Sequence, residues 1–225
     1  MSTAHDRRAL RRILDLLRKA YGPHPWQRWG NGVDILVGTI LSQNTSDTNS
    51  SAGFRHLRRQ FRSWNQVMNA PVDAVEKAIR ISGLSRIKAP RIQHILRQIK
   101  DDRGKIDLEF LRERSPEEAY DYLTHFKGVG PKTANCVLLF SFGMPLFPVD
   151  THIHRIALRL GLIPPKSTAE QAHDLLAPMI APENRYETHV LLIAHGRQTC
   201  RARNPLCPRC PLLSLCPFGQ SRLSP

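Results

Sequence analysis

FKGVGPKTANCVL, at residues 126–138, has the pattern of two helices joined by a tight hairpin. A capping box at Ser115–Glu118, with a proline at the first helical position, opens the first helix. Gly128 and Gly130 permit a tight turn and the close approach of another backbone. Pro131 then starts the second helix. The free N–H groups at its start favour a phosphate, although a Gly-x-Gly turn between helices also occurs as plain structure.

Lys132 occupies the first turn of this second helix, at its positively charged end. An ordinary lysine has a pKa of about 10.4 and is a poor nucleophile at neutral pH. The positive helix end and partial burial both favour the neutral amine, which is the nucleophilic form. The alternative is a solvated lysine that binds a phosphate, and the hairpin by itself leaves both interpretations open.

VDTHIHR, at residues 149–155, places an acid and two histidines at the start of another predicted helix. Asp150 stands where a helix N-cap belongs, which is a sufficient structural reason for an aspartate. The functional interpretation is a carboxylate near Lys132 that assists proton transfer and stabilises a cationic transition state. The two roles are compatible. His152 and His154 resemble metal ligands only superficially, because no second group of ligands matches them.

Four of the five cysteines lie within the last 26 residues, with the spacing C-x6-C-x2-C-x5-C. They are Cys200, Cys207, Cys210 and Cys216. Clustered cysteines in a chain without a secretory signal bind metal more often than they form disulfides. The single C-x2-C knuckle favours a 4Fe-4S cubane over a zinc ribbon, which usually pairs two knuckles. Cys136, in an apolar stretch, is interpreted as a core residue.

The loop between the first two clustered cysteines carries Arg201 and Arg203. From Arg197 onward the sequence has five arginines and no acidic residue. These arginines could contact the phosphates of a nucleic acid. The alternative is that they only offset the negative charge of a thiolate-bound cluster.

The composition is that of a globular protein with a large excess of positive charge. Its 225 residues include 33 lysines and arginines against 19 acids, which gives a net charge of +14. Nucleic acid is the expected partner, with a merely basic surface and an anionic membrane as weaker alternatives. No apolar run approaches the roughly 20 residues of a membrane span, and the N-terminus lacks the apolar segment of a secretory signal. We expect a cytoplasmic, nucleoid-associated monomer with no membrane partner.

The rest of the chain also has helical periodicity, with no convincing strand. An apolar stripe at spacing i, i+3, i+4, i+7 marks the first helix, which ends at Gly22. Further helical or apolar segments are expected at residues 33–41, 54–61, 71–81, 89–99, 149–160, 168–179 and 186–195. Everything from Gly196 onward is expected to be a loop around the cysteines. The pattern predicts an all-α fold.

Taken together, FKGVGPKTANCVL, VDTHIHRIALRLGL (149–162), HGRQTC (195–200) and the cysteine spacing resemble endonuclease III, of the helix-hairpin-helix DNA glycosylase superfamily. The resemblance covers most of the chain. It implies a six-helix domain at residues 25–144 and a discontinuous domain, 1–24 with 145–225, that holds a 4Fe-4S cluster on the four cysteines. DNA would bind in the cleft between the domains.

The resemblance also implies a bifunctional DNA glycosylase and AP lyase of base excision repair. Lys132 matches the family's Schiff-base lysine, and Asp150 matches its catalytic aspartate. The family removes oxidised pyrimidines such as thymine glycol from double-stranded DNA, acts at abasic sites, and cuts the strand 3′ to the lesion by β-elimination. Gly128, Val129 and Gly130 would contact the DNA backbone.

Two departures from the family pattern concern DNA contacts. Where the family usually has Leu-Pro before Gly-Val-Gly, this chain has Phe126 and Lys127, and Lys127 is a candidate phosphate contact. The family usually has Gln in the loop that fills the hole left by the extruded base. Asn44 matches that position here, with Gln43 beside it, and this shorter plug bears on damage preference. Leu84 matches the wedge that enters the opposite strand.

Two other functions are compatible with parts of the sequence. A monofunctional adenine or thymine mismatch glycosylase shares the scaffold, but such relatives usually have Ser or Tyr at the position of Lys132. A non-catalytic DNA-binding protein with a metal knuckle would have no need to pair Lys132 with Asp150. A lysine and an aspartate together favour the glycosylase with lyase activity.

Overall fold

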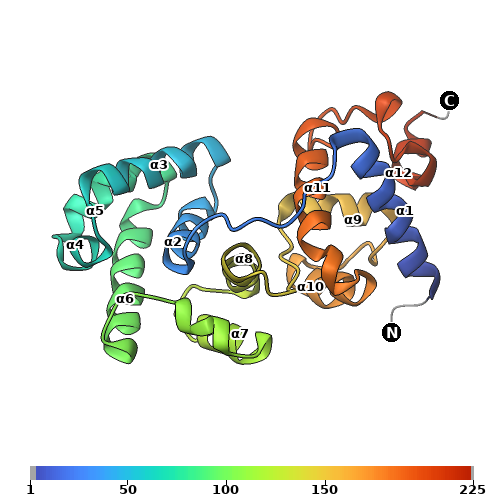
Figure 1. Cartoon of the computed structure of the whole chain (residues 1–225). Helices are drawn as coiled ribbons and strands as arrows, with labels where there is room; N and C mark the ends of the chain where they lie inside the picture. The colour runs from blue at the N-terminus through green and yellow to red at the C-terminus, as the bar shows by residue number, and fades with distance from the viewer. Residues whose placement is uncertain (1–3, 224–225) are drawn as a thin grey trace. The chain divides into compact units, whose positions relative to one another are not determined.

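The structure is a computed structural model that describes residues 4–223, and these form helices joined by loops, with no β-strand (Figure 1). The predicted all-α fold is confirmed. None of the described helices has the length and apolar composition that a membrane crossing requires.

The chain forms two compact units. We call Arg28–Met144 the hairpin unit, and Met1–Gln27 together with Pro145–Pro225 the cysteine unit. The domain expected at residues 25–144 starts three residues before the hairpin unit does. The outermost residues of the other expected domain, 1–3 and 224–225, lie outside the described residues.

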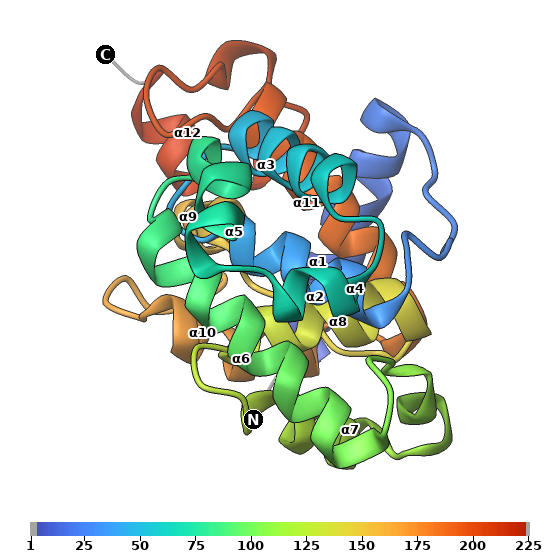
Figure 2. The ribbon, with the colours of Figure 1, turned by 90° about the vertical axis from the view of Figure 1, so that its left-hand side faces the viewer.

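The hairpin unit is built around an apolar helix, α2, which packs against α3, α6 and α8. Helix α6 also packs against α4 and α5, and Figure 2 shows it crossing the unit diagonally. The elements of the hairpin unit are α2 (Gly32–Ser42), α3 (Asp47–Gln60), α4 (Trp64–Asn69), α5 (Val72–Ile79), η1 (Arg80–Ser82), α6 (Ser85–Arg103), η2 (Glu109–Glu113), α7 (Pro116–Thr124) and α8 (Pro131–Phe142).

Helices α7 and α8 form the hairpin for which this unit is named. The Ser115 side chain accepts from the Glu118 backbone N–H while the Glu118 carboxylate accepts from the Ser115 N–H, which completes the predicted capping box. Phe126 ends the first arm as a buried core residue. The chain then turns at Gly128, whose φ of +88° suits a glycine.

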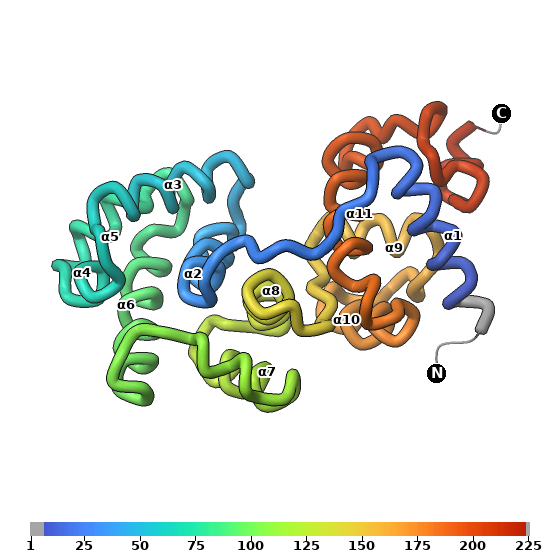
Figure 3. Tube along the Cα trace, viewed as in Figure 1, coloured from blue at the N-terminus to red at the C-terminus, as the bar shows by residue number. Residues whose placement is uncertain are grey.

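The cysteine unit joins the two ends of the chain. The predicted apolar stripe of α1, which includes Leu10 and Leu17, is buried, and α1 packs on α11 (Figure 3). Arg18 on α1 reinforces this contact with an ion pair to Glu187 of α11 at 2.6 Å. The elements of the cysteine unit are α1 (Ala4–Tyr21), α9 (Thr151–Leu160), α10 (Ala169–Leu176), η3 (Ala177–Met179), η4 (Pro182–Asn184), α11 (Arg185–Gln198), η5 (Cys207–Arg209), η6 (Leu213–Leu215) and α12 (Pro217–Ser221).

Several helix boundaries differ from the expected ones. Helix α3 begins at Asp47, well before residue 54, because Ser46 caps it by accepting from the Asn49 N–H. Helix α6 begins at Ser85 rather than at residue 89, directly after a left-handed residue. The segment after Gly196 contains two short 3-10 turns and α12 in addition to the expected loop.

Candidate active site and cysteine centre

Lys132 lies at an open helix N-terminus. Gly130 is the N-cap of α8 and provides no side chain to cap it. Within the described part of the chain, the backbone N–H groups of Gly130 and Lys132 donate no hydrogen bond. The half-buried Lys132 side chain makes no hydrogen bond or ion pair there either. The hairpin therefore presents an amine and free backbone donors at the positive end of one helix.

The other hairpin residues differ in what they can offer to a ligand. The Val129 side chain is only 4% exposed, so this predicted DNA contact has only its backbone available. Lys127 is exposed, and no described residue forms an ion pair with it. The predicted phosphate contact at Lys127 is thus free for an outside partner, while Val129 anchors the turn in the core.

Asp150 caps helix α9. Its Oδ1 accepts from the backbone N–H groups of His152 and Ile153, both at 2.9 Å. Its Oδ2 accepts no hydrogen bond from the described residues. One carboxylate oxygen thus serves the cap while the other is available, which makes a cap role and a chemical role compatible.

The segment before Asp150 is fixed by two buried histidines. The ring of His173 accepts from the Val149 N–H at 3.0 Å, and its other nitrogen lies 3.0 Å from the Ala169 carbonyl oxygen. His189 lies 2.9 Å from the carbonyl oxygen of Pro148 through Nδ1. Periodicity alone did not single out either histidine for this role.

The two histidines that follow Asp150 are engaged elsewhere. His152 packs its ring on Gly196 and accepts a hydrogen bond from Arg155 at 3.0 Å. His154 Nε2 lies 2.7 Å from the Ser167 carbonyl oxygen. Both rings therefore have structural partners among the described residues.

The predicted catalytic residues belong to different units, Lys132 to the hairpin unit and Asp150 to the cysteine unit. Each is held by contacts within its own unit. The hairpin unit also contains the predicted plug and wedge residues.

The plug loop, Gln43–Asn44, and the wedge loop, Gly83–Leu84, share an unusual backbone conformation. Asn44 has a φ of +53° and Leu84 a φ of +51°, both in the left-handed region. This region is strained for leucine and is tolerated better by asparagine. Leu84 is 49% exposed, and Asn44 is exposed as well. Strain at exposed side chains is a feature of binding sites.

Gln43 and Asn44, the two candidates for the plug, have different surroundings. The Gln43 amide donates to the Gly128 carbonyl oxygen at 3.3 Å, and its carbonyl accepts from Arg91 at 3.1 Å. Arg91 also lies against Gly128, where a Cβ atom would come within 2.4 Å of its Nε. Gln43 and Arg91 thus link the plug loop to the hairpin, and the exposed Asn44 is left as the better plug candidate.

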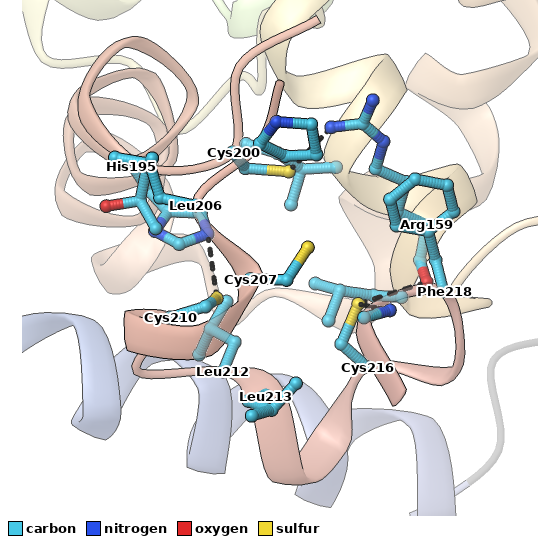
Figure 4. Close-up of a pocket in the computed structure, with 15 residues that line it drawn as sticks. Arg159, His195, Cys200, Leu206, Cys207, Cys210, Leu212, Leu213, Cys216 and Phe218 are labelled. Atoms are coloured by element: carbon cyan, nitrogen blue, oxygen red, sulfur yellow. Dashed lines mark hydrogen bonds between the residues drawn. The ribbon is translucent and has the colours of Figure 1, made fainter. Parts of the chain in front are cut away.

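The four C-terminal cysteines line a single pocket together with apolar side chains such as Leu212 (Figure 4). None of the four forms a disulfide bond. Among the described residues, no group of three or more His, Cys, Asp or Glu side chains is arranged to hold a single metal ion.

The chemistry of these thiols fits a cationic group that several sulfur ligands coordinate. Burial and, to a smaller extent, the neighbouring cysteines together raise the pKa of the Cys210 thiol to about 11. Burial also raises the pKa of Cys216. A bound cation would relieve this mutual repulsion. Four cysteine sulfurs that line one apolar pocket, two of them on buried residues, are the donor set of an iron–sulfur cluster.

Hydrogen-bond donors surround the sulfurs. Arg159 on α9 donates to Cys200 Sγ at 3.2 Å, and the Gly219 N–H donates to Cys216 Sγ at 3.3 Å. His195 Nε2 lies 3.7 Å from Cys210 Sγ. Sequence reasoning missed Arg159, because no local signal marks an arginine in the last turn of a helix as the partner of a cysteine 41 residues away.

Arg159 also explains how the loop with Arg201 and Arg203 is held. Its guanidinium donates to the carbonyl oxygens of Arg201 and Ala202, at 2.7 and 3.1 Å. The side chains of Arg201 and Arg203 are exposed and make no hydrogen bond or ion pair with described residues. The contact to a cysteine sulfur therefore comes from Arg159, while the two loop arginines face solvent.

Sequence comparison places the chain among DNA repair proteins. Residues 37–182 match the HhH-GPD superfamily of base excision DNA repair proteins. Endonuclease III of Bacillus subtilis is 34% identical over 192 residues, which are 85% of this chain and 84% of that protein. A candidate DNA glycosylase of Arabidopsis thaliana is 42% identical over 165 residues, which are 73% of this chain but only 56% of that protein.

Structural comparison gives the same result. A trapped endonuclease III–DNA covalent intermediate, described as an estranged-adenine complex, has a TM-score of 0.82 and 31% identity and is covered over 100% of both chains. The predicted resemblance to endonuclease III is confirmed.

Proposed function

The chain belongs to the HhH-GPD superfamily of base excision DNA repair proteins, and from this we propose that it is a DNA glycosylase with AP lyase activity. Its substrates are double-stranded DNA with oxidised pyrimidines of the thymine glycol type, and abasic sites. It acts as a monomer. Lys132 carries the proposal, because an amine without a partner among the described residues stands at the open N-terminus of α8.

Lys132 is the nucleophile of the proposed reaction. A damaged nucleotide must first leave the base stack, since the stacked base hides its sugar C1′. The lone pair of Lys132 Nζ forms a bond to C1′, and the glycosidic bond breaks with its electron pair going to the base, which takes up a proton. The amine loses a proton, and its lone pair then forms the C=N bond of an imine at C1′ as the C1′–O4′ bond breaks. The electron pair of that bond goes to O4′, which takes up a proton, so the sugar ring opens.

The imine makes strand cleavage possible because it acidifies the C2′ proton. Removal of that proton lets the C3′–O bond break, with the electron pair leaving on the phosphate oxygen, so that the strand is cut 3′ to the lesion. Water then hydrolyses the imine and frees Lys132. No nucleotide cofactor takes part in these steps.

Asp150 is the acid–base partner in this proposal. The Oδ2 oxygen, which the helix cap does not use, can accept a proton from the attacking amine and stabilise the cationic sugar. Oδ1 holds the carboxylate in place through the two backbone N–H groups of α9.

Cys200, Cys207, Cys210 and Cys216 would hold a 4Fe-4S cluster. The cluster would supply cross-linking of the C-terminal segment, with no part in the bond changes at the sugar. Through Arg159, a fixed cysteine loop would present Arg201 and Arg203 to the DNA backbone.

Borohydride trapping on duplexes that each carry one lesion tests the proposal. Thymine glycol and abasic duplexes should give a covalent protein–DNA band, and undamaged duplex should give none. Excision of a mismatched adenine or thymine without a covalent band would instead support the monofunctional alternative. Tight binding without excision of any lesion would support a non-catalytic DNA-binding protein.

A further inference from the structure

Lys88 is a lysine in the core of the hairpin unit. It is 1% exposed, although lysine is among the residues least often fully buried. Burial lowers the pKa of Lys88 below its ordinary value, and the nearby Arg91 lowers it further. No described carboxylate forms an ion pair with it. A buried amine without an acid needs another reason to be retained.

The partners of Lys88 are two backbone carbonyls at the C-terminal ends of α2 and η1, directly before the plug and wedge loops. Its Nζ donates to the carbonyl oxygen of Leu41 and to that of Ser82, both at 2.8 Å. Leu41 lies three residues before Asn44, and Ser82 lies two residues before Leu84. One amine therefore ties the base of the plug loop to the base of the wedge loop.

Arg91, one turn further along α6, continues this arrangement. It donates to Gln43 of the plug loop and lies against Gly128 of the hairpin. The same face of α6 thus holds the plug loop, the wedge loop and the hairpin in register. Asn44 and Leu84 both have a left-handed backbone conformation, and their side chains are exposed. Because little packing holds exposed side chains, their positions depend on the backbones of the two loops.

We propose that Lys88 is a positioning residue for nucleotide extrusion, which sets the distance between the plug and wedge loops so that Asn44 and Leu84 enter the base stack together. This inference rests on the proposed function, since it needs a flipped nucleotide. Lys88 does not touch DNA in this proposal. It acts through the backbone of the two loops.

Gln93 provides a matched control on the same helix. Its side chain is 3% exposed, and its Nε2 donates to the carbonyl oxygens of Val67 and Ala70 at 2.9 and 2.8 Å. Lys88→Met and Gln93→Met each remove a buried donor from α6 and replace it with an apolar chain of similar length. Only the first releases the plug and wedge loops.

The first measurement compares two substrates in single-turnover reactions. With thymine glycol in a fully paired duplex, Lys88→Met should react about 10- to 100-fold more slowly than the unaltered protein, because misplacement on the order of 1 Å can cost about 10² in rate. At an abasic site beside unpaired bases, where little stack must be replaced, the reduction should be less than about threefold. Gln93→Met should slow both reactions equally, if at all.

The second measurement needs no chemistry. A duplex with an unreactive abasic analogue and 2-aminopurine in the opposite strand reports unstacking by fluorescence when protein binds. Gln93→Met should give the full fluorescence rise, and Lys88→Met should give less than half of it at saturating protein. Lys88→Gln keeps a donor group on a shorter side chain and guards against a folding defect, and it should give an intermediate rise.

The outcomes separate this inference from the proposed function. A normal fluorescence rise without excision by the unaltered protein would remove the proposed activity but leave the positioning role standing. Equal rises for Lys88→Met and Gln93→Met, or equal reductions in rate on both substrates, would show that Lys88 only stabilises the fold.

Discussion

His173 accepts a hydrogen bond from the backbone N–H of Val149, the residue directly before Asp150, at 3.0 Å. The ring must be neutral to do so, because a protonated imidazole has no acceptor. The other ring nitrogen is then the one that donates to the Ala169 carbonyl oxygen. Glu170 and Asp174 are the charged groups close to the ring, and both favour its protonation.

This hydrogen bond predicts a loss of stability in mild acid. Burial lowers the pKa of His173 below its ordinary value of 6.5, so the unfolded chain binds the proton more readily than the folded protein. The free energy of unfolding should therefore fall as the pH drops below about 6.5, and this contribution should level off below the folded pKa. Urea unfolding of the unaltered protein and of His173→Gln at several pH values measures it. Identical pH dependence in the two proteins would contradict the prediction.

Replacing the proposed nucleophile should abolish trapping without preventing binding. Lys132→Gln should give no covalent band with borohydride, yet bind abasic duplex nearly as well as the unaltered protein, because a nucleophile contributes little in the ground state. Gel shift and trapping on the same duplex measure both. Lys127→Gln, an exposed lysine of the same hairpin, is the control and should still trap. A covalent band from Lys132→Gln would identify another amine as the nucleophile.

Two substitutions at Asp150 should separate its cap role from its chemical role. Asn caps a helix about as well as Asp, so Asp150→Asn should keep its stability but lose about 10²–10⁴ in turnover. Asp150→Ala should show the same loss in turnover, and its free energy of unfolding should be about 1 kcal/mol lower. Thermal unfolding and single-turnover excision measure the two effects. Normal turnover of the Asn variant would mean that Asp150 is only a cap.

The exposed loop arginines should contribute to the salt dependence of DNA binding. Replacing Arg201 and Arg203 with Gln should flatten the slope of log K against log salt by up to about two, because each arginine would neutralise one phosphate. Titrations of undamaged duplex at several salt concentrations measure the slope. Arg7 and Arg8, which are near neighbours on α1, give a matched control pair for the same reduction in charge. If the two double variants cannot be distinguished, the loop makes no special contact with DNA.

Arg159 should stabilise the cluster that we propose. The protein as purified should contain about four irons per chain, as expected for a cubane on four cysteines. Arg159→Met should lose iron to a chelator faster, by about 10- to 100-fold if the rate of loss follows the drop in metal affinity that removal of a ligand's hydrogen-bond partner typically causes. Arg222→Met is the control, since Arg222 lies over the Phe218 ring as Arg159 does but makes no hydrogen bond to a cysteine sulfur among the described residues. Stoichiometric zinc in place of iron would refute the cluster.

The parts of the site that the sequence predicted are those with local signals. The hairpin, the Asp150 cap and the first helix each depend on residues within about four positions of one another, and such patterns can be read directly. Helix α4 was overlooked although it has the same kind of signal, since Ser63 and Gln66 form a capping box. Attention to S-x-x-Q would have found it.

The parts that the sequence did not predict depend on long-range contacts. The partner carbonyls of Lys88 include one 47 residues away, and Arg159 reaches a cysteine 41 residues further along the chain. A lysine or arginine on a helix is usually a solvated surface residue, and no periodic pattern marks the exceptions. Their roles follow only from the packing of complete elements.

Helix α9 begins directly after its cap, Asp150, and its later turns carry Arg155 and Arg159, which donate to the Cys200 carbonyl oxygen and the Cys200 sulfur. Helix α9 therefore connects the Asp150 carboxylate at its N-terminus to the cysteine loop that its later turns contact. Under the proposed function, loss of the cluster would loosen the contacts of the cysteine loop with α9 and so disturb the position of Asp150. The contacts of Lys88 and Arg91 lie within the hairpin unit and would persist. A cell short of iron would then retain a protein that still opens the base stack but excises poorly, and such a protein would occupy lesions instead of clearing them.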